Sequence, residues 1–125
     1  MADGLPLSTT TSATEYRSGA SVAYDVSENR HEHHILATAT VPAAIDSRTA
    51  SNAVRTARAI AEDLAYVGVL AVELFAVAGP AGTILLVNEI APRVHNSFHW
   101  TEDACVVSQF EQHIRAIAGW PLADP

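Results

Sequence analysis

Short stretches of alternating and apolar residues mark the first half of the chain. Residues 22–26 alternate in polarity, which predicts a half-buried strand. The apolar and β-branched run 35–41, which ends at a proline, predicts a second strand, and the segment between them, residues 27–34, is polar and rich in histidine. The first eighteen residues show no sustained period and are rich in Ser, Thr, Gly and Ala, so we expect residues 1–18 to form a mobile lead-in.

An amphipathic pattern follows. Asp46 or Ser47 can cap a helix by accepting a hydrogen bond from a free amide of its first turn. Arginines and a glutamate occupy one side of the pattern, which indicates a helix packed on a sheet and ending near Gly68. The apolar residues that define its other side, at helical spacing, are Ala50, Ala53, Val54, Ala57, Ile60, Ala61 and Leu64.

The second half of the chain predicts a hairpin and a final helix. Residues 69–77 and 83–90 are apolar runs around the turn-like sequence Gly79-Pro80-Ala81-Gly82, which is typical of an antiparallel hairpin. A last helix is expected over residues 101–119, with Gly119 placed to stop it. The predicted order is β-β-α-β-β-α, an α+β arrangement with a mainly antiparallel sheet and two packed helices.

Composition narrows the classes of function. The chain has 125 residues, a formal net charge of -7 and 49% hydrophobic residues, so it can bury a core. We expect one partial domain over residues 19–122, followed by a tail of residues 123–125. All seven basic residues are arginines, and without lysine the chain has no Schiff-base lysine, phosphate-loop lysine or lysine general base. The acidic balance argues against nucleic-acid binding.

Cysteine use and targeting signals point to the cytoplasm. Cys105 is the only cysteine, which excludes an intrachain disulfide and a thiolate metal cluster and predicts a buried structural residue. The first fifteen residues lack a basic start followed by an apolar run, so we expect no secretory signal. No stretch reaches the roughly 20 apolar residues of a membrane helix, so we expect no membrane partner.

Glu73 and Glu89 interrupt the two apolar runs of the predicted hairpin. A carboxylate among apolar side chains is costly to bury unless it is paired or bound to a metal. With the hairpin centred on Ala81, the two acids face each other on one side, with Cβ atoms about 4.5–5.5 Å apart. Mg²⁺, which prefers oxygen ligands, would relieve their repulsion, and Asn88 adds an amide beside them. The alternatives are that an acid reaches a nearby arginine, or that another register keeps the two acids apart.

Two polar clusters are further candidates for binding. Residues 93–100 place a permanent cation, two imidazoles, an amide and a hydroxyl in one loop, and arginine's planar fork suits a phosphate or carboxylate. The alternative is a solvated loop anchored by Trp100. His31, His33 and His34 form the second cluster, but neighbouring residues point in different directions and a zinc site needs three or four convergent ligands. A surface histidine patch is the simpler interpretation.

Seven segments carry a resemblance to one family, at residues 28–31, 34–36, 66–75, 88–97, 99–101, 108–117 and 119–122. They resemble the N5-carboxyaminoimidazole ribonucleotide synthases, which are ATP-grasp ligases, and the resemblance covers about residues 22–122. The formate-dependent glycinamide ribonucleotide transformylases come second, because they usually have His-Asp-Thr where this chain has His95-Asn96-Ser97.

The resemblance implies a function and a set of ligands. Members of this family use Mg-ATP and bicarbonate to make carboxyphosphate, and then carboxylate aminoimidazole ribonucleotide in purine biosynthesis. By this resemblance Glu73 and Glu89 would hold Mg²⁺ ions that bridge the phosphates of ATP. His31, Asn88 and Glu89 would line the nucleotide site.

The loop after the second acid would face the other substrates. By the same resemblance Arg93, His95 and Asn96 would bind the ribonucleotide or the carboxyphosphate, and Arg93 and His95 are the catalytic candidates. Family members usually carry glycine at position 98, so Phe98 is expected to obstruct this loop or to strain its backbone. Nothing in the chain matches the family's N-terminal domain, its lid with lysines that clasp ATP, or its C-terminal domain.

Three hypotheses follow. The leading one is a partial ATP-grasp carboxylase that is inactive alone and is completed by an N-terminal partner chain. The competing hypothesis is a non-catalytic module of the same fold that binds a protein partner or forms a homodimer. The third is metal capture by His31, His33 and His34.

Overall fold

The computed structural model describes residues 7–15 and 19–125. Among these residues, six strands form one sheet, with five in the order β4-β3-β1-β5-β6 and β2 paired with β1, and every pair is antiparallel. The strands are β1 Leu7–Glu15, β2 Ser21–Ala23, β3 Ser27–Glu32, β4 Ile35–Thr40, β5 Gly68–Gly79 and β6 Gly82–Ala91. The helices are α1 Ser47–Asp63, the 3-10 turn η1 Asn96–Phe98, α2 Thr101–Ala104 and α3 Gln109–Ala118.

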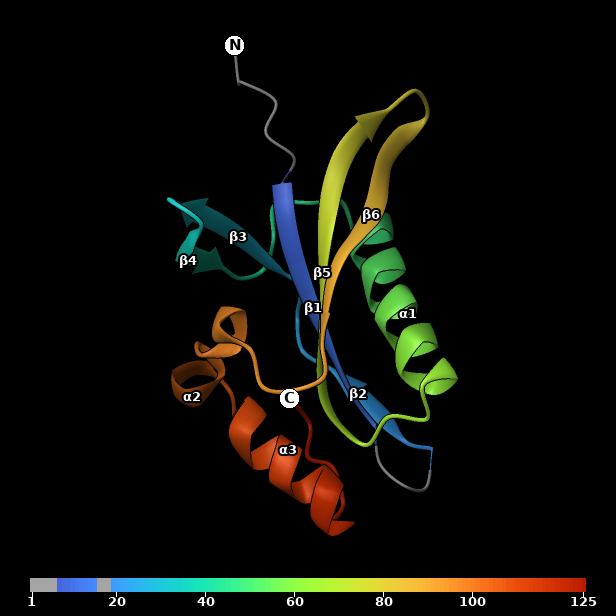
Figure 1. The fold of residues 1–125 in the computed structure, drawn as a ribbon, viewed down its shortest axis with the longest axis vertical. Helices are drawn as coiled ribbons and strands as arrows, with labels where there is room; N and C mark the ends of the chain where they lie inside the picture. Colours follow the sequence, from blue (N-terminus) through green and yellow to red (C-terminus); the bar gives the residue numbers. More distant parts are fainter. Residues whose placement is uncertain (1–6, 16–18) are drawn as a thin grey trace.

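Helices cover both sides of this sheet. Figure 1 shows α1 on one side of β5 and β6, and η1, α2 and α3 on the other side. The predicted class, α+β with a mainly antiparallel sheet and packed helices, is confirmed. None of the helices in the described part of the chain is long and apolar enough to cross a membrane.

Strand β1 lies in the middle of the sheet, between β3 and β5. The prediction of a mobile lead-in is therefore wrong for residues 7–15, and the remaining residues of that lead-in, 1–6 and 16–18, lie outside the described residues. The sequence of β1, LSTTTSATE, contains four threonines, and this β-branched residue favours strands. Without an apolar alternation the strand gives no periodic signal.

The histidine-rich segment forms a hairpin. We expected a polar connection over residues 27–34, but β3 and β4 pair there, and His33 and His34 form the two-residue turn between them. Both have positive φ, 51° and 66°, as a tight hairpin turn of this hand requires. The predicted strand 35–41 is confirmed as β4, whereas the strand predicted over 22–26 ends after three residues as β2.

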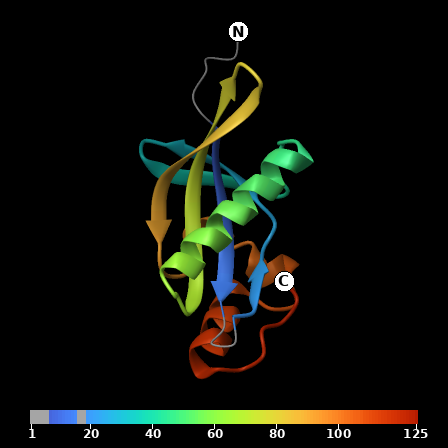
Figure 2. The ribbon, with the colours of Figure 1, turned by 90° about the vertical axis from the view of Figure 1, so that its right-hand side faces the viewer.

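Helix α1 is confirmed, and it begins where the sequence predicted. The Asp46 carboxylate accepts a hydrogen bond from the Thr49 amide at 2.9 Å and another from the Thr49 hydroxyl at 2.6 Å. One helix face consists of small buried residues, so the helix lies close on the sheet, as Figure 2 shows. This face and the strand residues beneath it form the larger apolar core, which contains Val26, Ala43, Ala53, Ala57, Ala61, Leu70, Val72 and Leu74.

The single helix expected over residues 101–119 is wrong, because the chain forms two helices there. The break falls at Cys105, whose backbone is extended (φ -114°, ψ 153°). Ser108 then starts α3, since its hydroxyl accepts a hydrogen bond from the Glu111 amide at 3.3 Å. The predicted stop at Gly119 is confirmed, with a left-handed φ of 73°.

A smaller aromatic core holds the connection between α2 and α3. Tyr24, Phe98 and Trp100 contact one another with ring centroids 6.2–6.3 Å apart, and the half-buried Cys105 packs against this cluster. The buried Tyr24 hydroxyl donates to the Val107 carbonyl at 2.7 Å. This bond ties the connection to the segment that follows β2.

Candidate functional site

The two acids of the hairpin lie directly opposite each other. Glu73 of β5 pairs with Glu89 of β6, as predicted, but the hairpin is centred between Pro80 and Ala81 and not on Ala81. From that centre an unbroken ladder would pair Glu73 with Asn88. A β-bulge inserts one extra residue on β6 between these positions and brings Glu89 opposite Glu73. Residues directly opposite each other share one face of a sheet, so the bulge puts the two carboxylates on the same side.

Neither acid is buried. Glu73 is half-buried and Glu89 is exposed, so the assumption of two acids sequestered among apolar side chains is wrong. Asn88 donates from Nδ2 to Oε1 of Glu73 at 2.9 Å and orients this carboxylate. The result is an accessible pair of carboxylates on one hairpin, with a neighbouring amide bound to one of them.

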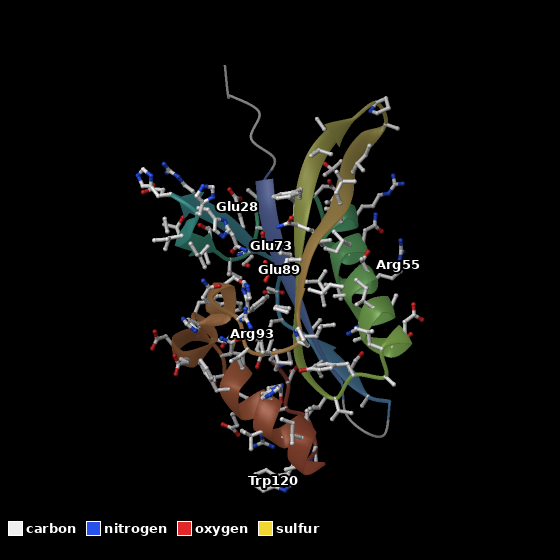
Figure 3. The ribbon with its side chains drawn as sticks, viewed as in Figure 1. Glu28, Arg55, Glu73, Glu89, Arg93 and Trp120 are labelled. Atoms are coloured by element: carbon white, nitrogen blue, oxygen red, sulfur yellow. The ribbon has the colours of Figure 1, made fainter. Side chains whose placement is uncertain are left out.

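Alternation along β5 separates the candidate site from the larger core. Leu70, Val72 and Leu74 belong to the core under α1. Ala71 belongs to the aromatic core on the opposite face, and Glu73 shares that face because side chains alternate along a strand. Figure 3 shows Glu73, Glu89 and Arg93 on the side of the sheet where η1 lies, and Arg55 on the other side, on α1.

Strand β3 contributes polar residues that the sequence analysis did not single out. Ser27 lies in the same row of the sheet as Glu73, because both pair with Thr10 of β1. Ser27 and Asn29 are buried, and the Ser27 hydroxyl donates to Oδ1 of Asn29 at 3.1 Å. Residues 27, 29 and 31 alternate along β3 and share one face of the sheet. Because these residues are polar, a search for alternating apolar residues does not find this strand.

His95 caps the turn η1 with its own side chain. Its Nδ1 accepts a hydrogen bond from the Ser97 amide at 3.3 Å and lies 2.8 Å from the Ser97 hydroxyl. Because Nδ1 is an acceptor, the neutral ring carries its proton on Nε2. The main chain of His95 is bound as well: its amide donates to Oε1 of Gln109 at 2.9 Å, and its carbonyl accepts from Nε2 of Gln109 at 2.8 Å.

The electrostatics of His95 show which groups gather around it. Burial lowers the pKa of His95, and the positive charge of Arg93 lowers it further. The negative charges of Glu73 and Glu89 raise the pKa of His95, and the charge of His31 lowers it. The structure therefore brings together five of the predicted site residues from three separate segments.

The other two predicted residues lie beside this group. Asn88 contacts Glu73 as described above, and Asn96 is the first residue of η1 and is exposed. Arg93 is exposed, and Nη1 of its guanidinium donates to the Val94 carbonyl at 2.9 Å, which leaves other N–H groups of the fork for an anion. An acidic pair and a cation thus face one region.

Phe98 does not obstruct the loop, contrary to expectation. Its side chain is fully buried against Tyr24 and Trp100, so the ring belongs to the aromatic core. Its backbone is not strained either, since the positive φ values outside glycine among the described residues belong to His33, His34 and Ala65. In this chain position 98 anchors the loop.

The histidine cluster gives no metal site. Within residues 19–125, no group of three or more His, Cys, Asp or Glu side chains is close enough together to hold a metal ion. His33 and His34 occupy a two-residue turn, where consecutive side chains diverge. Metal capture by His31, His33 and His34 is therefore not supported within these residues.

A separate cleft lies on the opposite side of the sheet. Its volume is about 840 Å³, and it runs between α1 and the segments around Val26 and Ala43, with Arg55 and Arg58 among its lining residues. It contains none of the predicted site residues. The predicted site residues therefore lie around the open acidic hairpin and not in this cleft.

The fold belongs to a known class of domain. A sequence model of the ATP-grasp domain matches residues 9–110, so the chain belongs to the ATP-grasp family. Within the family it is similar to the N5-carboxyaminoimidazole ribonucleotide synthase of Brucella melitensis, with 55% identity over 112 residues. That match covers 90% of this chain and 30% of the relative.

Solved structures agree with the sequence match. The ADP complex of an N5-carboxyaminoimidazole ribonucleotide synthetase has a TM-score of 0.88 and 41% identity, over 97% of this chain and 32% of that chain. The Aspergillus clavatus synthase in complex with ADP and 5-aminoimidazole ribonucleotide has a TM-score of 0.80 and 27% identity, over 94% and 30%. The chain therefore spans about a third of the length of these relatives.

Proposed function

We propose that the chain supplies the metal-binding and substrate-facing part of the ATP site of a ligase that carboxylates 5-aminoimidazole ribonucleotide. By the family resemblance, the reaction would use ATP and bicarbonate and would belong to purine biosynthesis. The relatives are named as synthases of N5-carboxyaminoimidazole ribonucleotide, and one of them is solved in complex with ADP and 5-aminoimidazole ribonucleotide. The observation that carries the proposal is the bulge that brings Glu89 opposite Glu73. Without this bulge, one carboxylate would face the amide of Asn88.

The donor set fits Mg²⁺. Two accessible carboxylates on one face are the hard oxygen ligands that this ion prefers, and phosphate oxygens and waters would complete its octahedral shell. When bound, the ion would neutralise charge on the phosphates of ATP. Asn88 would keep Oε1 of Glu73 oriented, and His31 and Asn88 would line the nucleotide beside Glu89.

The loop residues would bind the anionic substrates. The Arg93 guanidinium would donate charge-assisted hydrogen bonds to the carboxyphosphate or to the ribonucleotide phosphate. His95 would act as a neutral imidazole, because its pKa is lowered, and its proton on Nε2 would be the free donor of the ring. Asn96 would add an exposed amide to the same region.

The chain would not complete the reaction alone. It contains no lysine, so lysine contacts to the ATP phosphates would have to come from residues outside this chain. A second candidate function, as a module for association, is favoured by the exposed apolar residues of the edge strand β6, among them Ile84, Leu86 and Ile90. The same surface would serve to bind the remainder of the enzyme.

Complementation tests the proposal. We expect bicarbonate- and ribonucleotide-dependent ATP hydrolysis when the chain is mixed with the missing part of the Brucella relative, or when it replaces the matching region of that enzyme in a chimera. Glu89→Gln should reduce this activity by at least about tenfold, because the carboxylate is a metal ligand.

A matched control separates the loss of a negative charge from the loss of a metal ligand. Glu62→Gln removes the same charge from an exposed position on α1, on the other side of the sheet, and should leave the activity unchanged. A chimera that folds but shows no substrate-dependent hydrolysis, or equal losses in the two variants, would overturn the proposal.

A further inference from the structure

Two buried glutamines of α3 each hold a stretch of main chain. Gln109 and Gln112 are both 0% exposed. Gln109 exchanges two hydrogen bonds with the main chain of His95, at 2.9 and 2.8 Å, and Gln112 does the same with Ala123, at 2.7 and 3.1 Å. A buried carboxamide is costly unless its oxygen and nitrogen are both paired, and both pairs are made here.

Gln109 binds the substrate-facing loop at a second point. Its own amide donates to the Thr101 hydroxyl at 3.0 Å, and this hydroxyl donates to the Phe98 carbonyl at 2.7 Å. The first residue of α3 therefore holds the loop at the start and at the end of η1. Every bond in this set is buried, so water cannot replace a missing partner without entering the core.

These bonds fix the backbone from which the His95 side chain projects. His95 has an extended backbone (φ -131°, ψ 144°), with its amide and its carbonyl bound to one side chain. The ring is then fixed by the Ser97 amide, which holds Nδ1 as an acceptor. The Phe98 amide also donates to the His95 carbonyl at 3.0 Å, so the backbone bonds of η1 begin from the same anchored group.

We propose that Gln109 is the positioning residue of the site: its carboxamide holds the His95 main chain, so that the imidazole stays bound to Ser97 in a single tautomer. The proposal rests on the function proposed above for His95. It assigns Gln109 no contact with substrate, because the side chain is fully buried and its carboxamide is used by the His95 main chain.

Gln112 provides a matched control on the same helix. It has the same side chain and is equally buried, and its carboxamide also exchanges two hydrogen bonds with one main-chain residue, but that residue is Ala123, in the segment after α3. The Gln112 side chain also interacts with the Tyr24 hydroxyl. The two glutamines thus differ in the main chain that they bind: Gln109 binds His95, and Gln112 binds Ala123. Gln109→Met and Gln112→Met remove the two carboxamides at nearly constant volume.

The experiment compares the full chain with these two variants by NMR, with the His95 ring labelled with nitrogen-15. In the wild type and in Gln112→Met we expect one tautomer, with the proton on Nε2. In Gln109→Met we expect a mixture of tautomers, and exchange of the His95 and Phe98 amide hydrogens that is about tenfold faster or more. Urea unfolding of both variants measures how much stability each has lost.

The outcomes separate positioning from stability alone. A mixed His95 tautomer in Gln109→Met, but not in a comparably destabilised Gln112→Met, supports the proposal. An unchanged tautomer in a folded Gln109→Met, or equal changes in both variants, overturns it. If Gln109→Met does not fold, Gln109→Glu is judged by the same criteria, because its carboxylate still accepts from the His95 amide and no longer donates to the His95 carbonyl.

The tautomer and the exchange rates are read without any ligand. An inactive chimera would therefore overturn the proposed function. It would leave the role of Gln109 in place if the His95 tautomer still responds to Gln109→Met and not to Gln112→Met.

Discussion

The two faces of the sheet are stabilised by different kinds of contact. Toward α1, β5 presents Leu70, Val72 and Leu74 to a row of small buried side chains, and the contact is apolar. Toward η1 and α3 the contacts include buried hydrogen bonds, such as those between Gln109 and His95. Strand β5 thus separates the larger apolar core from a side that combines the smaller aromatic core with a network of buried hydrogen bonds.

This difference explains where the candidate chemistry lies. Apolar packing has no preferred direction and scales with the area removed from water, so it holds the fold together without fixing a single orientation. Hydrogen bonds are directional, so they can hold a side chain such as His95 in one pose. We therefore expect changes on the α1 face to alter stability, and changes on the polar face to alter geometry and pH dependence.

The largest expected effect is on the α1 face. Leu74→Ala removes a fully buried side chain from the core under α1 and should lower the free energy of unfolding by about 2–5 kcal/mol. Leu86→Ala, at an exposed position of β6, should cost far less. Urea unfolding followed by circular dichroism measures both, and similar losses in the two variants would contradict the apolar character assigned to this face.

Acid should destabilise the polar face. Burial lowers the pKa of His113 and of His95 from the ordinary value of 6.5. In each, Nδ1 accepts a backbone hydrogen bond, from Val69 at 2.9 Å and from Ser97 at 3.3 Å, and a protonated ring cannot accept it. The unfolded chain takes up these protons at higher pH than the folded chain does, so stability is full above 6.5 and falls as the pH drops through the folded pKa values.

Urea unfolding between about pH 7.5 and about pH 5.5 checks this prediction. His113→Gln keeps a possible acceptor for the Val69 amide and removes the titration, so the loss of stability over this range should become smaller. Helix α1 contains no histidine, and Leu74→Ala should therefore keep the pH dependence of the wild type. An unchanged slope in His113→Gln would contradict the assignment of acid sensitivity to this face.

The apolar face could be predicted from the sequence, whereas on the polar face the sequence indicated the paired acids and the loop residues but not the buried glutamines that hold the loop. Helix α1 has an alternation of apolar and charged residues at helical spacing and a strong capping residue, Asp46, and it was found with its start correct. In helix α3, by contrast, apolar side chains are exposed and polar side chains are buried. Phe110, Ile114 and Ile117 are 38%, 58% and 49% exposed, while two glutamines are buried. Periodicity assigns the apolar residues to the core, so it gives no sign of these glutamines.

Register shows a second limit of sequence reasoning. The pairing of Glu73 with Glu89 was predicted from a hairpin centred on Ala81, and the pairing is confirmed although the centre is not. The bulge on β6 offsets the difference, and no residue type marks a bulge of this kind without its partner strand. Strand β1 was missed for a related reason: its place between β3 and β5 depends on pairing, which local pattern does not encode.

The smallest expected effect comes from the cap that begins α3, and it tests whether this cap helps to hold the loop that contains His95. Ser108→Ala removes the hydroxyl that accepts from the Glu111 amide at 3.3 Å, and should cost about 0.5–1 kcal/mol of stability, as for other helix caps. Ser47→Ala is the matched control, because Ser47 is the first residue of α1 and the cap there is Asp46. If α3 is anchored mainly by Gln109, the His95 ring should keep its single tautomer in Ser108→Ala despite the lost cap. A mixed tautomer in this variant would mean that the helix start, and not the glutamine, holds the loop.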